Sequence, residues 1–124
     1  MGISIQIKGI EEAKQFLKNT SSKTFEAANK AIVKAGFYVE GEVKESIAGQ
    51  RAEQRSVDTG RFLNSVKNVQ NQPLTASVET NVEYAKFLEY GTTKMQPRHH
   101  FTNSAKRSEP KVKEFVQAEI NKTL

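Results

Sequence analysis

The sequence of 124 residues contains no cysteine, no apolar stretch as long as a membrane span, and no recognisable catalytic signature. Without cysteine the chain has no disulfide scaffold, no thiol redox chemistry and no zinc site with thiolate ligands. A helix that spans a bilayer needs roughly 20 consecutive apolar residues. The first ten residues alternate between apolar and polar types and so lack the continuous apolar run of a secretory signal. We therefore expect no membrane partner and no secretion.

Signatures of enzymes and metal sites are missing as well. There is no G-x-S-x-G nucleophile motif and no G-x-x-x-x-G-K-[ST] phosphate loop. The two histidines, His99 and His100, are adjacent and lack the spacing of three or four residues that brings two imidazoles to one helix face. Paired carboxylates at 11–12 and 40–42 suit a helix start and a solvated face. The sequence predicts a protein that is not an enzyme and has no metal and no cofactor.

The chain carries a net charge of +5, from 19 Lys and Arg against 14 Asp and Glu, with the two signs interspersed. Most of these residues fit a solvated surface of mixed charge. A basic stretch that includes Phe101 follows Gly91, and such a stretch can contact a phosphate backbone without reading bases. No helix-turn-helix or zinc finger accompanies it. The residues that could face DNA are Arg51, Arg55, Lys94, Lys106 and Arg107.

The spacing of apolar residues predicts a single α+β domain over residues 1–124. Alternating apolar and polar residues are typical of half-buried strands, and the expected strands are 3–8, 66–70 and 74–79. Apolar residues at every third or fourth position are typical of helices. The expected helices are about 10–19, about 23–48, a turn within 58–66 capped by Asp58 or Thr59, two turns that end at Gly91 in a left-handed conformation, and a C-terminal helix. A small, mostly antiparallel sheet is thus expected to pack against one long helix and the C-terminal helix.

Two glycines and one proline leave alternatives open. Gly36 and Gly41 mark either a bend in the long helix or a close approach of another backbone. The C-terminal helix begins either close to Pro110, or earlier near Thr102 with a kink at the proline. Residues 49–57 lack apolar periodicity and are expected to form a flexible loop. The side chains expected to be largely buried are Phe25, Ile32, Val39, Phe87, Leu88, Phe115 and Val116.

Two segments resemble motifs of a known protein family. Residues 58–66 read DTGRFLNSV, and residues 81–92 read NVEYAKFLEYGT and are followed by Met95, Pro97 and Arg98. Both segments are similar to those of the gene-product-ten-like family, the tail-completion or head–tail joining proteins of long-tailed double-stranded DNA bacteriophages. The order of the expected elements is similar along essentially the full chain. One departure is that His99 and His100 precede Phe101, where family members commonly have Pro-Phe after the basic residue.

The resemblance implies an assembly function. It implies a structural subunit of the phage neck that forms a homo-oligomeric ring, a hexamer or a dodecamer, made in the host cytoplasm and built into the virion. Its partners would be a head-side connector or stopper protein, a tail-tube or terminator protein, and, without sequence specificity, the packaged DNA. A tail-terminator protein is the alternative within this class, and a small basic DNA-binding regulator is the alternative outside it. The residues implied in subunit or partner contacts are Arg51, Arg55, Asp58, Thr59, Gly60, Arg61, Tyr84, Glu89, Tyr90, Gly91, Thr92, Met95, Arg98, His99 and His100.

Overall fold

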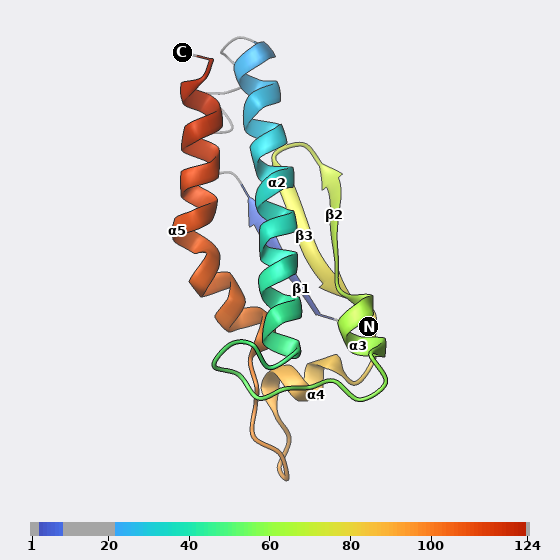
Figure 1. Cartoon of the computed structure of the whole chain (residues 1–124). Helices are drawn as coiled ribbons and strands as arrows, with labels where there is room; N and C mark the ends of the chain where they lie inside the picture. Colours follow the sequence, from blue (N-terminus) through green and yellow to red (C-terminus); the bar gives the residue numbers. More distant parts are fainter. Residues whose placement is uncertain (1–2, 9–21, 124) are drawn as a thin grey trace.

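The computed structural model describes residues 3–8 and 22–123, and this part of the chain forms three strands and four helices (Figure 1). In chain order the elements are β1 (Ile3–Lys8), α2 (Ser22–Ile47), α3 (Arg61–Ser65), β2 (Lys67–Gln72), β3 (Thr75–Thr80), α4 (Ala85–Tyr90) and α5 (His100–Asn121). The helix expected over about 10–19 lies outside the described residues. The structure confirms the α+β prediction of a small antiparallel sheet, one long helix and a C-terminal helix.

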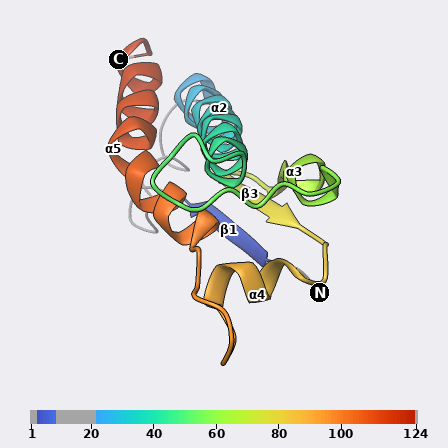
Figure 2. The same ribbon diagram turned by 60° about the horizontal axis from the view of Figure 1, so that its bottom comes forward.

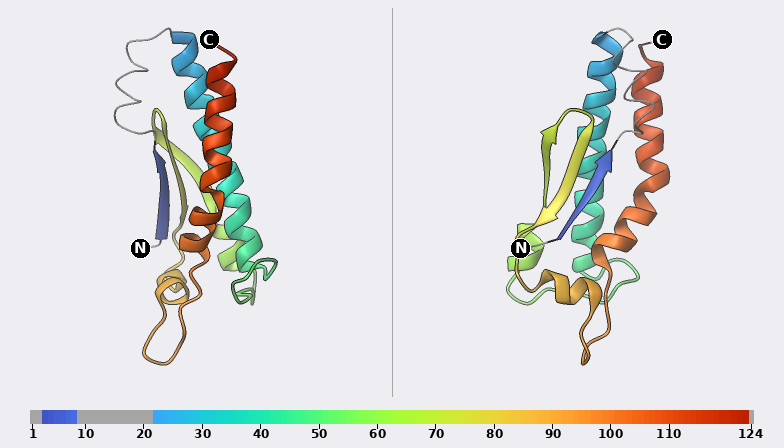
Figure 3. Two further views of the ribbon diagram at one scale, coloured as in Figure 1. Left: turned by 90° about the vertical axis from the view of Figure 1, so that its left-hand side faces the viewer. Right: turned by 180° about the vertical axis from the view of Figure 1, so that it is seen from behind.

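The three strands pair antiparallel in the order β1-β3-β2. Val78 in β3 lies opposite Ile5 of β1 and Asn68 of β2. Because successive side chains of a strand point to opposite faces, Ile3 and Ile5 share a face with Val78, and both Ile3 and Val78 are buried. α2 lies along this face of the sheet (Figures 1 and 3). The alternation in the sequence therefore identifies the core face of β1.

α2 is the helix on which the sheet and α5 pack. With 26 residues and a rise of ~1.5 Å per residue it is about 39 Å long. Its apolar residues recur every three or four positions and form one stripe. The buried members of this stripe are Ala28, Ala31, Ile32, Ala35, Val39, Val43 and Ile47. The main core cluster continues into later parts of the chain through Phe62, Val66, Val78, Val82, Ala85 and Phe101.

α5 runs beside α2 along most of the length of α2 (Figure 1). It begins at His100 and contains Pro110, so the earlier of the two predicted starts is the correct one. Midway along the pair, the ring of Phe115 meets that of Tyr38 edge-on, with 5.7 Å between the ring centroids. None of the described helices combines the length and the apolar character that crossing a membrane requires.

One of the two glycines of α2 is a point of close packing. A Cβ atom on Gly36 would overlap the side-chain amide of Asn68, whose Nδ2 donates a hydrogen bond to the carbonyl oxygen of Val33 at 3.2 Å. The backbone N–H of Asn68 donates to the carboxylate of Glu40 at 2.8 Å. By contrast, a Cβ atom on Gly41 would meet nothing within 4 Å. Gly36 therefore marks a close approach, here by a side chain of β2, and Gly41 does not.

The predicted core is confirmed only in part. Ile32 and Val39 are buried, with 3% and 2% of their surface exposed. The predicted core residues that are only partly buried are Phe25, Leu88, Phe115 and Val116. The prediction for Phe87 is wrong, since 47% of its surface is exposed. The buried residues of α4 are Ala85 and Glu89, so this short helix presents Phe87 outward.

Candidate functional site

Both sequence motifs lie at one end of the molecule, which we call the motif end. It comprises α3, α4 and the loops 48–60 and 91–99, and it lies at the bottom of Figure 1, opposite the C-terminus. Figure 2 turns this end toward the viewer and shows α3 and α4 on the two sides of the end of β3. Segments that are about 20 residues apart in the sequence therefore contribute to one surface.

The first motif builds the tight turn into α3. Gly60 occupies the N-cap position with φ +84 and ψ −1, in the left-handed region that favours glycine. The predicted caps, Asp58 and Thr59, do not occupy that position, although the hydroxyl of Thr59 accepts a hydrogen bond from the backbone N–H of Arg61 at 3.3 Å. Phe62, which follows, is 3% exposed and belongs to the main core cluster. The motif thus anchors a loop to the core.

The second motif holds the start of α5. The carboxylate of Glu89 is 1% exposed and accepts hydrogen bonds from the backbone N–H groups of Phe101, at 2.8 Å, and Thr102, at 2.9 Å. The first N–H groups of a helix have no partner within the helix, and a carboxylate there also interacts favourably with the helix dipole. Glu89 therefore caps a helix that begins eleven residues later. The sequence offered no sign of this, because Glu89 lies on a different helix from the one it caps.

Gly91 ends α4 with φ +76 and ψ 178. The positive φ agrees with the prediction, but the ψ is extended, so the predicted left-handed helical conformation is wrong. A Cβ atom here would lie 2.8 Å from the carbonyl oxygen of Met95 and 2.8 Å from the nitrogen of Pro97. A short turn follows, in which Thr92 and Met95 exchange two backbone hydrogen bonds. Glycine is required here both by backbone conformation and by the returning chain.

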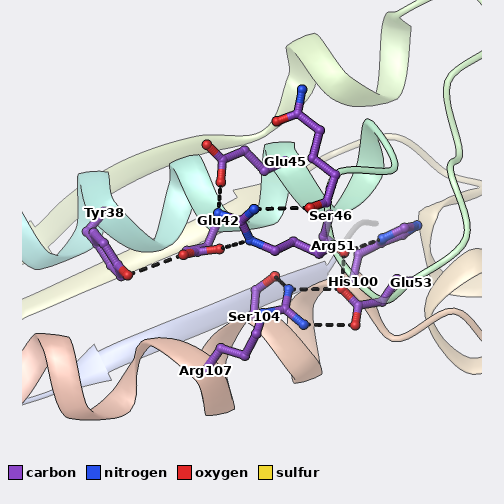
Figure 4. A network of polar contacts seen from close by, with 10 residues as sticks. Tyr38, Glu42, Glu45, Ser46, Arg51, Glu53, His100, Ser104 and Arg107 are labelled. Atoms are coloured by element: carbon purple, nitrogen blue, oxygen red, sulfur yellow. Dashed lines mark hydrogen bonds and ion pairs between the residues drawn. The ribbon is translucent and has the colours of Figure 1, made fainter.

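A buried polar network connects the loop 48–60 to α5 (Figure 4). His100 is fully buried, with Nδ1 2.7 Å from Ser46 Oγ and Nε2 2.7 Å from Ser56 Oγ. The Ser46 hydroxyl donates to the Glu53 carboxylate at 2.5 Å, so it must accept from Nδ1–H of His100, and Nε2 accepts from Ser56. Burial disfavours the charged imidazolium and lowers the pKa of His100 to about 4.

Glu53 is the acidic centre of this network. Its side chain is 4% exposed, and the carboxylate accepts two hydrogen bonds from the guanidinium of Arg107, at 2.8 and 2.9 Å, and one from Asn103 at 3.1 Å. Burial alone would raise the pKa of Glu53, but the bonds from Arg107, Ser46 and Asn103 outweigh it and lower the pKa to about 2. A bidentate Arg–carboxylate pair of this kind is a strong interaction with a fixed geometry.

The residues predicted to face DNA have unequal surroundings. Arg51 pairs with Glu42, at 2.8 Å, and with Glu45 on α2, and Arg107 pairs with Glu53. All five are exposed, but Arg55, Lys94 and Lys106 form no ion pair with another described residue. A contact with DNA stays a prediction for all five. The flexibility of residues 49–57 also stays a prediction, although Arg51, Glu53 and Ser56 tie this segment to α2 and α5.

A cleft of about 620 Å³ opens where the two motifs meet. Its floor and walls combine arginine side chains with apolar and aromatic ones. The lining residues are Arg55, Ser56, Val57, Asp58, Thr59, Gly60, Arg61, Phe62, Tyr84, Leu88 and Arg98. Seven of them are among the contact residues implied by the resemblance, so the structure brings this part of the predicted set together.

Beside the cleft, α4 exposes aromatic side chains. Tyr84, Phe87 and Tyr90 have 36%, 47% and 65% of their surface exposed. Their spacing of three places them near one another on a helix, on the side away from the buried Ala85 and Glu89. Among the described residues no group of three or more His, Asp or Glu side chains could bind a metal ion. The arrangement is suited to contact with another macromolecule.

The family model described as "Bacteriophage HK97-gp10, putative tail-component" matches residues 11–91 of the chain. Searches among curated proteins and among solved structures give no match. The matched residues include both motifs as far as Gly91. They therefore include ten of the eleven residues that line the cleft, together with the exposed aromatic residues of α4.

Proposed function

Because the chain belongs to the HK97-gp10-like family of bacteriophage tail components, we propose that it is a neck protein that completes the tail and joins it to the head connector through its motif end. A family of structural tail components is associated with the virion and is not expected to catalyse a reaction. The finer role, the location at the neck and the partners are the proposal. The alternative role within the same class is that of a tail terminator.

The observation that carries the proposal is the aromatic surface of α4. Exposed aromatic side chains are enriched at the centres of protein interfaces and are rare in clusters on a free monomer surface. Here three of them lie within seven residues, and the same segment supplies the buried Glu89 that fixes α5. The surface is therefore rigid before a partner arrives, which lowers the entropy lost on docking.

We further propose that copies of the chain assemble into a closed ring. A ring uses heterologous contacts, in which two different faces of each subunit meet. Phe37 on α2 is 58% exposed and lies outside the motif end, so the chain offers apolar surface at more than one place. Native mass measurement of the purified protein and counting of its copies in virions test this part. A single copy per virion would contradict it.

Head–tail joining by variants tests the docking surface. Heads and tails made without the protein are mixed with purified wild-type protein or with the double variant Phe87→Ala/Tyr90→Ala. Both side chains are largely exposed, so folding should be unchanged in far-UV circular dichroism and urea unfolding, whereas joined particles should fall at least tenfold. Glu109→Ala/Lys113→Ala is the matched control, because it also truncates two exposed side chains but lies on α5, outside both the motif end and the surface around Phe37. Normal joining by the double variant would overturn the proposal.

Tail length separates the proposed role from that of a terminator. If the protein completes the tail, particles made without it should contain tails of normal length that fail to attach to heads. If it terminates the tail tube, the tails should instead grow beyond their normal length. Electron microscopy of particles made without the protein measures both quantities in one experiment.

A further inference from the structure

The cleft at the motif end contains more arginine than the described carboxylates neutralise. Three arginines line it, Arg55, Arg61 and Arg98, against one carboxylate, that of Asp58. Arg61 pairs with Glu83 at the surface, with 3.1 Å between the two groups. Within the described part of the chain, no carboxylate forms an ion pair with Arg55 or Arg98. The cleft therefore carries uncompensated positive charge.

Arg98 is fixed in place before any ligand binds. Its backbone N–H donates to the carbonyl oxygen of Leu88 at 2.7 Å, and its Nη1 donates to the carbonyl oxygen of Arg55 at 3.1 Å and to Ser56 Oγ at 2.7 Å. Ser56 is itself bonded to the buried His100. Among the described residues, nothing accepts a hydrogen bond from Nε or Nη2 of Arg98. These two nitrogens form the edge of a guanidinium that a carboxylate can bind with both oxygens.

Apolar groups complete the lining. Phe62 is almost fully buried, Val57 and Leu88 are partly buried, and Tyr84 lies at the rim with its ring 6.0 Å from that of Phe62. An occupant that matches both features has carboxylates next to apolar side chains. Arginine is suited to such carboxylates because its planar guanidinium makes two parallel hydrogen bonds and is weakly hydrated.

We propose that this cleft binds an acidic segment of a partner protein, with a carboxylate at Arg98 and Arg55 and an apolar side chain over Phe62 and Leu88. The inference rests on the proposed function, since it describes how the motif end recognises a neighbouring virion protein. The proposed occupant is a different protein of the virion, because the net charge of +5 on this chain makes an acidic partner the better electrostatic match. Specificity would come from the fixed geometry of Arg98.

The size of the cleft and its apolar floor favour an acidic peptide over DNA. Proteins that bind a nucleic-acid backbone commonly use an extended positive groove with stacking platforms, whereas this cleft of about 620 Å³ accommodates only a few side chains. A carboxylate flanked by an apolar side chain uses both the charged wall and the apolar floor.

Peptide binding to the full chain tests the proposal. The probe is a blocked hexapeptide of alternating glutamate and leucine, and the comparison peptide has glutamine in place of glutamate. We expect the glutamate peptide to bind at least about tenfold more tightly, equivalent to ~1.4 kcal/mol, and to shift the NMR signals of Arg98 and Tyr84. Equal affinities for the two peptides would overturn the proposal, as would a short DNA duplex that displaces the glutamate peptide at equimolar concentration.

Arg55→Gln is the decisive variant. The one hydrogen bond of the Arg55 side chain in the described part is a long one, 3.5 Å, to the carbonyl oxygen of Val57, so folding should not depend on it. We expect this variant to weaken binding of the glutamate peptide about tenfold. Lys106→Gln removes the same charge from an exposed residue that does not line the cleft and should leave the affinity within twofold. Equal losses in the two variants would show a general charge effect and contradict the inference.

The same variants separate this inference from the proposed function. If Arg55→Gln loses both peptide binding and head–tail joining, both proposals are supported. If the wild-type protein binds neither peptide while Phe87→Ala/Tyr90→Ala still fails to join heads to tails, the cleft inference fails and the proposed function stands. If joining is normal for Phe87→Ala/Tyr90→Ala but the glutamate peptide binds as expected, the proposed function fails and the cleft is still shown to bind an acidic segment.

Discussion

Replacing Glu89 by glutamine changes one oxygen to an NH₂ group at a fully buried helix cap. In the native chain each carboxylate oxygen accepts one backbone N–H, from Phe101 and Thr102. The amide oxygen of glutamine can accept one of them, but its NH₂ then faces the other donor. The change removes one charge-assisted hydrogen bond, worth about 1.5–3 kcal/mol, and the charge at the helix start, worth about 0.3–1 kcal/mol. We expect a loss of about 2–4 kcal/mol in the free energy of unfolding.

Urea unfolding followed by circular dichroism measures this loss, which is large against a total stability of about 5–15 kcal/mol for a domain. Glu83→Gln is the matched control, because Glu83 is exposed and pairs with the exposed Arg61, and such surface pairs contribute little. In hydrogen exchange, the amides of Phe101 and Thr102 should lose protection first. A loss for Glu89→Gln below about 1 kcal/mol, no larger than that of the control, would refute the capping argument.

Other features of the structure lead to further predictions. The pKa of His100 is lowered to about 4, so the unfolded chain binds a proton that the folded chain does not, and stability should fall by up to about 3 kcal/mol as the pH drops from 6.5 to 4. The pKa of Glu53 is lowered to about 2, so the folded state should lose further stability as the pH falls below 4.5. Unfolding curves measured across this pH range test the contributions of both residues. Gly36→Ala should lower the free energy of unfolding in urea by about 1–3 kcal/mol, because the new methyl group displaces the side chain of Asn68. Gly41→Ala should instead stabilise the helix by about 0.5–1 kcal/mol in the same assay. Phe115→Ala should cost about 1–3 kcal/mol in urea unfolding, less than the ~3–5 kcal/mol of a full core site, because Phe115 is only partly buried.

The long elements could be predicted from the sequence because their periodicity extends over many residues. Ile32 and Val39 were placed in the core correctly, since a stripe of seven apolar positions has only one orientation that buries all of them. The prediction for Phe87 is wrong because its helix is too short to contain such a stripe. α4 has six residues, and over so short a helix the largest apolar side chain does not identify the buried face. There the small Ala85 and the capping Glu89 face the core instead.

The candidate site was recognised from its motifs, but its chemistry was not. The loop 49–57 has no apolar pattern, and its anchors are polar: Glu53 bonded to Arg107, and Ser56 bonded to His100. Such pairs join residues 44 and 54 positions apart, and no local spacing reveals them. The two adjacent histidines before Phe101, His99 and His100, are a departure from the family pattern in the sequence. In the structure His100 is fully buried and connects the loop to the last helix.

The cap at Glu89 also affects how the sequence can drift over evolutionary time. The residues matched to the family end at Gly91, yet Glu89 within them fixes the first turn of α5, which begins at His100. The two helices are therefore coupled, and a change at position 89 acts first on a helix outside the matched region. Beyond Ser108, by contrast, every described side chain of α5 is partly buried or exposed. Its exposed positions can therefore accept substitutions, while the cap at Glu89 keeps the starting point of the helix, and hence its direction along α2.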